Sequence, residues 1–207
     1  MKNYNKNLKL LTQNHVYSEE MEHDACGVGL IASTEGKKSR TVVEYGIQAL
    51  KAVWHRGAVD ADGKTGDGAG IHLEIPKEFF IEKIQVTGHD YDNSEICIGM
   101  IFLPRNDYSS QESSKTIVES ELTKNNFSIY GWRQVPVNPK VLGEKAFQTM
   151  PEIIQVLFKS NDSNLLDKDL ERKIYETRKK IEIKADNISL NNFYICSMSS
   201  KSVSYTH

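Results

Sequence analysis

The pattern of apolar positions divides the chain into a polar start and a region of short strands and helices. Residues 1–25 are rich in Asn, Lys and Glu and show no sustained period, so we expect a leader or arm. The character changes at Cys26–Ala32, where small and β-branched apolar residues predict a buried strand. The turn-forming residues Ser33–Gly36 end this strand.

A helix is predicted next. Thr41 and Glu44 have the spacing of a capping box, in which each side chain satisfies a free amide at the helix start. The apolar residues that recur at helical spacing are Val43, Ile47, Leu50 and Trp54. Gly57 is the expected stop.

The remaining segments alternate without the regular spacing of a doubly wound sheet. Residues 57–70 are rich in glycine and predict a loop. Strands are expected at 71–75, 96–103 and 193–198, with an edge segment at 127–137 and a strand or helical turn at 153–158. Helices are expected at 77–85, at 111–124 and in a charged segment with Leu166, Leu170, Ile174 and Ile181 on one side. An irregular tail follows. This loose alternation indicates an α+β fold.

Composition and charge exclude several classes of function. A chain of 207 residues with 39% hydrophobic and 26% charged residues is typical of a soluble globular protein. The net charge of −2 gives no attraction to nucleic acid or to an anionic membrane. The most apolar stretch, Ile96–Pro104, is too short to cross a bilayer. We therefore expect neither nucleic acid nor membrane as a partner.

Cysteine and histidine spacing argues against metal binding. The three cysteines lie far apart without Cys-x-x-Cys spacing, which disfavours both a disulfide framework and a zinc site. The six histidines form no ligand pair, so we expect no metal site. A reduced, cytoplasmic protein is the expectation.

Cys26 is the candidate nucleophile. A cysteine at the start of an apolar strand is by itself most simply a small core residue, an interpretation that fits Cys97 and Cys196. Cys26 differs in the motifs that accompany it. These are Cys26-Gly27-Val28-Gly29, then His55-Arg56-Gly57, then Asp62-Gly63-Lys64-Thr65-Gly66-Asp67-Gly68.

Together these motifs resemble the class II glutamine amidotransferases, and the third resembles the glutamate synthase branch in particular. Later segments agree with that branch, namely Ile129–Val135, Leu142–Glu144 and Phe193–Ser199. The resemblance covers almost the whole chain. It implies a partial four-layer αββα sandwich, with residues 26–207 as the amino-terminal portion of the amidotransferase domain. An amidophosphoribosyltransferase or an asparagine-synthetase-like enzyme fits the third motif less well.

The resemblance also implies a mechanism. The Cys26 thiol would attack the side-chain amide of L-glutamine, release ammonia and form a thioester that water hydrolyses to glutamate. The α-amino group of the nucleophile, with an ordinary pKa of about 7.7–8.0, would carry the proton. In the printed chain that nitrogen is an amide bonded to Ala25. Residues 1–25 are therefore expected to be a propeptide, and cleavage between Ala25 and Cys26 is expected to activate the site.

Three further residues are candidates for the site. Arg56 is either a cation at a helix end or, as the resemblance implies, a support that holds Cys26 and nearby backbone. Gly27 would matter by leaving space near the substrate. Asp67 could orient the glycine-rich loop or merely cap a turn, and both alternatives stay open.

Other family features fall outside this chain. The family's oxyanion hole includes an Asn-Gly pair, and this sequence has no Asn-Gly dipeptide. We therefore expect a fragment or a broken gene product that is inactive in isolation. The alternative function is a non-catalytic remnant or interaction module.

No cofactor is expected in this segment. The resemblance implies FMN and an iron–sulfur cluster for the full-length enzyme, whose synthase region passes ammonia to 2-oxoglutarate. The implied partners are L-glutamine, the remaining synthase chain and a small electron-donating subunit. NADPH, NADH and ferredoxin stay open as the electron donor.

Overall fold

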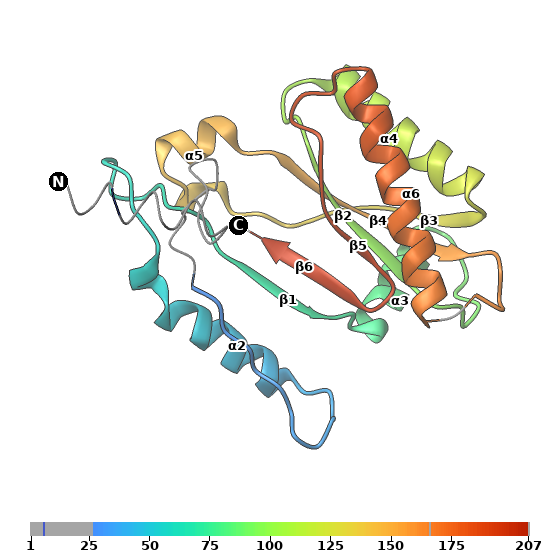
Figure 1. Ribbon diagram of the computed structural model, residues 1–207, viewed down its shortest axis with the longest axis horizontal. Coiled ribbons are helices and arrows are strands. Elements are labelled where there is room, and N and C mark those ends of the chain that lie inside the picture. Colours follow the sequence, from blue (N-terminus) through green and yellow to red (C-terminus); the bar gives the residue numbers. More distant parts are fainter. Residues whose placement is uncertain (1–5, 7–26, 166, 207) are drawn as a thin grey trace.

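The computed structural model describes residue 6 and residues 27–165 and 167–206 (Figure 1). The predicted leader at 1–25, except for residue 6, and the candidate nucleophile Cys26 therefore lie outside the described residues. The described elements are α2 (Arg40–Ala52), η1 (Trp54–Arg56), β1 (Gly70–Glu74), α3 (Lys77–Val86), β2 (Cys97–Leu103), α4 (Tyr108–Lys124), β3 (Phe127–Gln134), η2 (Pro139–Val141), α5 (Glu144–Thr149), β4 (Glu152–Ser160), α6 (Asp167–Asn187), β5 (Tyr194–Ser199) and β6 (Ser202–Thr206).

Strands β4 and β2 form the centre of a four-stranded antiparallel sheet with the order β3-β4-β2-β5. Every residue of β2 except Phe102 is buried, as expected for a continuous apolar run covered on both faces. Gly99 lies opposite Val156 of β4, and a Cβ at Gly99 would lie 2.7 Å from Val156 Cγ1. The close packing of these two strands therefore requires glycine at this position.

The two faces of the sheet are covered by different elements (Figure 1). Helices α4 and α6 cover one face and enclose a core that includes Phe127 and Phe158. On α6, Leu170, Ile174 and Ile181 are buried, as the helical spacing predicts, whereas Leu166 lies outside the described residues. Helix α3 and the strands β1 and β6 cover the other face.

Strands β1 and β6 pair antiparallel to form a second, two-stranded sheet. Val203 of β6 is buried against the larger sheet, and Leu73 of β1 packs on the same core. Helix α2 lies along β1, where Lys38 and Glu74 form an ion pair of 2.7 Å. In Figure 1, β1 lies between α2 and the larger sheet. The layers are therefore the helices α4 and α6, the four-stranded sheet, the two-stranded sheet and helix α2 (Figure 1). This arrangement confirms the α+β class and the partial αββα layering.

Several predicted elements need correction. Residues 27–32 form no strand; Val28 and Leu30 are 87% and 89% exposed, because no described strand pairs with them. The cap of α2 is Ser39, whose hydroxyl accepts from the Val42 amide, and not Thr41. Trp54 lies in η1 and is 75% exposed, so it does not extend the buried side of α2.

Two segments had no predicted regular structure. The end of the chain, expected to be irregular, forms β6, and residues 144–149 form α5. The ambiguous segment at 153–158 is part of the strand β4. Both β4 and β6 acquire their regular structure from partners that are distant in the chain, β2 and β1.

Substitution of Phe158 tests the packing of the core that lies between the four-stranded sheet and the helices α4 and α6. It is fully buried and its ring meets the Phe127 ring edge-on at 5.3 Å. We predict that Phe158→Ala lowers the free energy of unfolding by about 3–5 kcal/mol in urea denaturation. The control Tyr175→Ala removes a ring that is 58% exposed on α6 and should change it by no more than about 0.5 kcal/mol. Equal losses in the two variants would contradict this packing.

Candidate active site

The glycine-rich segment between η1 and β1 folds into a small hairpin, formed by residues 58–67. Val59 and Gly66 form an antiparallel bridge, and the Asp60 amide donates to the Thr65 carbonyl oxygen at 2.8 Å. At the tip, the Gly63 amide donates to the Asp60 carbonyl oxygen at 2.9 Å. Gly63 has φ +69°, a left-handed conformation that favours glycine. The predicted loop therefore has a defined shape.

Asp67 closes the base of this hairpin. Its Oδ2 accepts a hydrogen bond of 2.7 Å from the backbone amide of Ala58, nine residues away. The carboxylate thus joins the outgoing strand of the hairpin to the incoming one, directly after Gly57. This geometry favours the loop-orienting alternative for Asp67 over a purely local cap.

Asp62 holds the turn at the other end of the hairpin. Its Oδ1 accepts from the amides of Lys64 at 2.9 Å and Thr65 at 2.7 Å. Its Oδ2 accepts from the Thr65 hydroxyl at 2.5 Å. The hydrogen bond from the Thr65 hydroxyl is the largest of the effects that lower the pKa of Asp62 to about 2. The sequence motif includes Asp62, but Asp62 was not predicted as a site residue. Asp followed three residues later by Thr is nevertheless a recognisable turn signal.

Arg56 and Gly27 lie together at the end of the first helix. Arg56 is the last residue of η1, is exposed, and donates its backbone amide to the Val53 carbonyl oxygen at 2.9 Å. A Cβ at Gly27 would lie 3.3 Å from Arg56 Cβ and 3.2 Å from Val53 Cβ. The chain that follows Cys26 therefore passes close to Arg56. Cys26 and Ala25 themselves lie outside the described residues.

The three described candidates, Gly27, Arg56 and Asp67, thus belong to one region. Gly27 packs on Arg56, and Arg56 is joined through Gly57 to Ala58, which Asp67 binds. A hollow of about 200 Å³ lies within the hairpin, lined by Ala58, Val59, Asp60, Thr65, Gly66 and Asp67.

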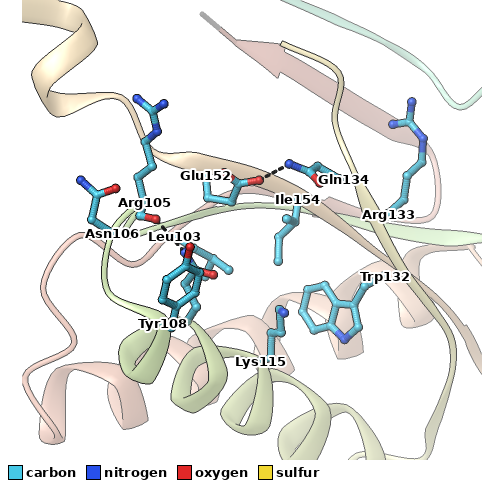
Figure 2. Close-up of a pocket in the computed structure, with 11 residues that line it drawn as sticks. Leu103, Arg105, Asn106, Tyr108, Lys115, Trp132, Arg133, Gln134, Glu152 and Ile154 are labelled. Carbon is cyan, nitrogen blue, oxygen red and sulfur yellow. Dashed lines mark hydrogen bonds between the residues drawn. The ribbon is translucent and has the colours of Figure 1, made fainter. Parts of the chain in front are cut away.

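A second pocket of about 590 Å³ lies at the start of α4, between β2, β3 and β4 (Figure 2). Several of its polar side chains bond to protein groups. Arg105 lies over the ring of Phe147, and Arg133 donates to Gln155. Figure 2 shows both guanidinium groups pointing away from Lys115, which pairs with Glu112 outside the lining. We assign this pocket no chemistry.

The other two cysteines lie in the core. Cys97 is fully buried in β2, and burial, followed by the charges of Glu171 and Glu95, raises the pKa of its thiol. Cys196 on β5 is half-buried. Neither lies in the hairpin region.

The described residues offer neither a cluster of metal ligands nor a membrane-spanning helix. Across residues 27–165 and 167–206, no group of His, Cys, Asp and Glu side chains could hold a metal ion. Among the described helices, none combines the length and the apolar character needed to cross a bilayer.

Comparison with known proteins identifies one family for residues 26–207. The family model for class II glutamine amidotransferases matches residues 26–207. The NADPH glutamate synthase large chain of Azospirillum brasilense is 48% identical over 202 residues, which cover 98% of this chain and 13% of that protein.

Ferredoxin-dependent relatives match the same region. The ferredoxin-dependent glutamate synthase of Pyropia yezoensis is 38% identical over 204 residues, covering 95% of this chain and 13% of that protein. The chloroplastic enzyme of Spinacia oleracea is 36% identical over 187 residues, covering 89% of this chain and 11% of that protein. The chain therefore spans a small fraction of the length of the relatives it matches.

Thiol reactivity tests the assignment of Cys97 to the core. We predict that Cys97 in the folded protein reacts with iodoacetamide at pH 8 at least about ten-fold more slowly than in urea, because burial keeps the thiol protonated and inaccessible. Peptide mass spectrometry after timed labelling gives both rates. Equal rates in the folded and unfolded protein would contradict the burial.

Proposed function

The chain belongs to the class II glutamine amidotransferases, and from that premise we propose that it is the glutaminase part of a glutamate synthase. It hydrolyses L-glutamine to glutamate and ammonia, with Cys26 as the nucleophile. The close approach of the Gly27 backbone to Arg56 is the observation that carries the proposal, because Gly27 is bonded to Cys26. The printed names of the relatives support the choice of glutamate synthase within the family.

The reaction follows from the chemistry of a thiol and an amide. The Cys26 sulfur bonds to the carbonyl carbon of the glutamine side chain, and the C–N bond breaks to release ammonia. The proton of the thiol passes to the α-amino group of Cys26 and from there to the leaving nitrogen. Water then attacks the thioester, releasing glutamate and restoring the thiol. No oxidant or reductant is needed for this half of the reaction.

The neighbouring residues support this reaction in different ways. Arg56 has a rigid fork of donors that suits holding the backbone around the nucleophile. Gly27 has no side chain, and a Cβ there would crowd Val53 and Arg56. Asp67 keeps the hairpin closed beside Arg56 through Ala58.

The wider activity of the protein is part of the same proposal. Ammonia passes to 2-oxoglutarate in a synthase region that contains FMN and an iron–sulfur cluster, with a small electron-donating subunit as a partner. The relatives' names include both NADPH and ferredoxin, so both donors stay open. Three widely spaced cysteines fit a reducing compartment such as the cytoplasm. A non-catalytic module that keeps half of the glutaminase fold is the second candidate.

Replacement of the nucleophile tests the proposed reaction. In the full-length synthase polypeptide, Cys26→Ala should lower glutamine-dependent glutamate formation at least about 10³-fold, because alanine has no thiol to form the thioester. Glutamate formation from added ammonia should be unchanged. The control Cys196→Ala should keep both activities within about two-fold. Full glutamine-dependent activity in Cys26→Ala would contradict the proposal and favour the non-catalytic module.

Processing at Cys26 is a separate prediction. An amide nitrogen at Cys26 cannot act as the base, so the form that retains residues 1–25 should hydrolyse glutamine at least about 10²-fold more slowly than the processed form. The comparison uses one protein with an engineered protease site ending at residue 25, assayed before and after cleavage. Equal glutaminase rates would show that the leader is not an inhibitory propeptide.

A further inference from the structure

The tip of the hairpin is held by a second segment that lies about eighty residues further along the chain. Gly143 is buried, and a Cβ there would overlap Thr65 Oγ1 and Asp62 Oδ2 and lie 2.5 Å from the Thr65 amide nitrogen. Only glycine therefore allows this segment to lie against the turn at 62–65. Gly143 is also the residue that precedes α5.

Two polar contacts reinforce this packing. The backbone amide of Glu144, the first residue of α5, donates to the Asp62 carboxylate. Lys145 forms an ion pair of 2.6 Å with Asp60 on the hairpin. The Asp62 carboxylate thus binds its own turn and the start of α5 at once. We call Asp62, Thr65 and Gly143, with the Asp60–Lys145 pair, the tip clamp.

The tip clamp contributes little to the hydrophobic core. Within the described residues, neither core cluster contains a side chain from 57–69 or from 139–149. Asp62 is exposed, and the Asp60–Lys145 pair is partly exposed, which limits what each adds to global stability. A set of specific contacts with a small effect on stability points to a role in shaping the hairpin.

The tip connects to the proposed active site through a short series of contacts. The two strands of the hairpin are paired through Val59 and Gly66, so a displacement of the tip moves the base. At the base, Asp67 binds Ala58, which is two residues after Arg56. The position of Arg56 relative to the substrate therefore depends on the position of the tip.

We propose that Asp62 and Gly143 are positioning residues for glutamine hydrolysis, which hold the hairpin at 58–67 in the shape that the reaction requires. This inference rests on the proposed glutaminase function. Neither residue contacts the reacting atoms in this account. The hydrogen bonds that keep the pKa of Asp62 near 2 also keep its carboxylate ionised throughout the pH range of an enzyme assay.

The test compares two activities of the full-length synthase. In Asp62→Asn and in Gly143→Ala, kcat/KM for glutamine should fall by about 10–100-fold, because small displacements at a reacting centre have effects of this size. Glutamate formation from added ammonia should be unchanged, which a general folding defect would not allow. Unchanged kcat/KM for glutamine in both variants would overturn the proposal.

A matched control separates the loss of hairpin positioning in Asp62→Asn from the general effect of removing a carboxylate that caps a turn. Asp107 makes the two corresponding contacts with the residue three positions later at the start of α4, where it accepts from the Ser110 amide at 3.0 Å and from the Ser110 hydroxyl at 2.6 Å. Asp107→Asn should leave kcat/KM for glutamine within about two-fold. A loss equal to that in Asp62→Asn would assign the effect to turn stability and overturn the positioning role.

Thr65 provides a rescue experiment at the same contact. Thr65→Val removes the hydroxyl that bonds to Asp62 and should lower kcat/KM for glutamine by about 3–10-fold, whereas Thr65→Ser keeps the hydroxyl and should stay near the parent value. Equal values in the two variants would overturn the role of this contact.

Parallel assays of Cys26→Ala distinguish a failure of the proposed glutaminase function from a failure of the positioning role. If Cys26→Ala keeps glutamine-dependent activity, the proposed function fails. If Cys26→Ala loses that activity while Asp62→Asn and Gly143→Ala keep it, the proposed function stands and the positioning role alone fails.

Discussion

The hydrogen bonds between two carboxylates and the backbone of the glycine-rich segment are the interactions on which the proposed active site depends. Glycine loses more conformational entropy on folding than any other residue, so a segment with this composition has no intrinsic preference for one shape. Asp67 joins the two ends of the segment, and Asp62 joins three groups at its tip. Because these acceptors are carboxylate groups, each hydrogen bond is stronger than one between neutral groups. The segment therefore forms one hairpin next to Arg56.

The rest of the fold supplies the frame for that hairpin. The chain enters it from η1 and leaves it into β1, and α2 and β1 lie side by side. Strand β1 is in turn held by β6 and by the apolar core beneath, where Val203 and Leu73 pack on the larger sheet. The segment before α5 then contacts the tip from another direction. Core packing through β1 thus fixes the outgoing end of the hairpin, whereas polar contacts fix its shape.

Local patterns predicted the elements whose regularity arises within the element itself. The helical spacing of Leu170, Ile174 and Ile181 predicted α6, and the apolar run of β2 predicted that strand. The family motifs identified Gly27, Arg56 and Asp67 as candidate site residues. Features that depend on distant partners were missed. Strand β6 exists because it pairs with β1, and the importance of Gly143 follows only from its contact with Thr65. The strand predicted for Val28 and Leu30 is wrong for the same reason, since no described strand pairs with it.

The most direct measurement is a crystal structure of the full-length protein after reaction with a diazo-ketone analogue of glutamine. We expect continuous density from the analogue to Sγ of Cys26, with Arg56 beside the adduct and the hairpin closed by the Asp67–Ala58 hydrogen bond. An adduct on another residue, or an adduct on Cys26 out of contact with Arg56 and the hairpin, would contradict the claim that this region is the glutaminase site.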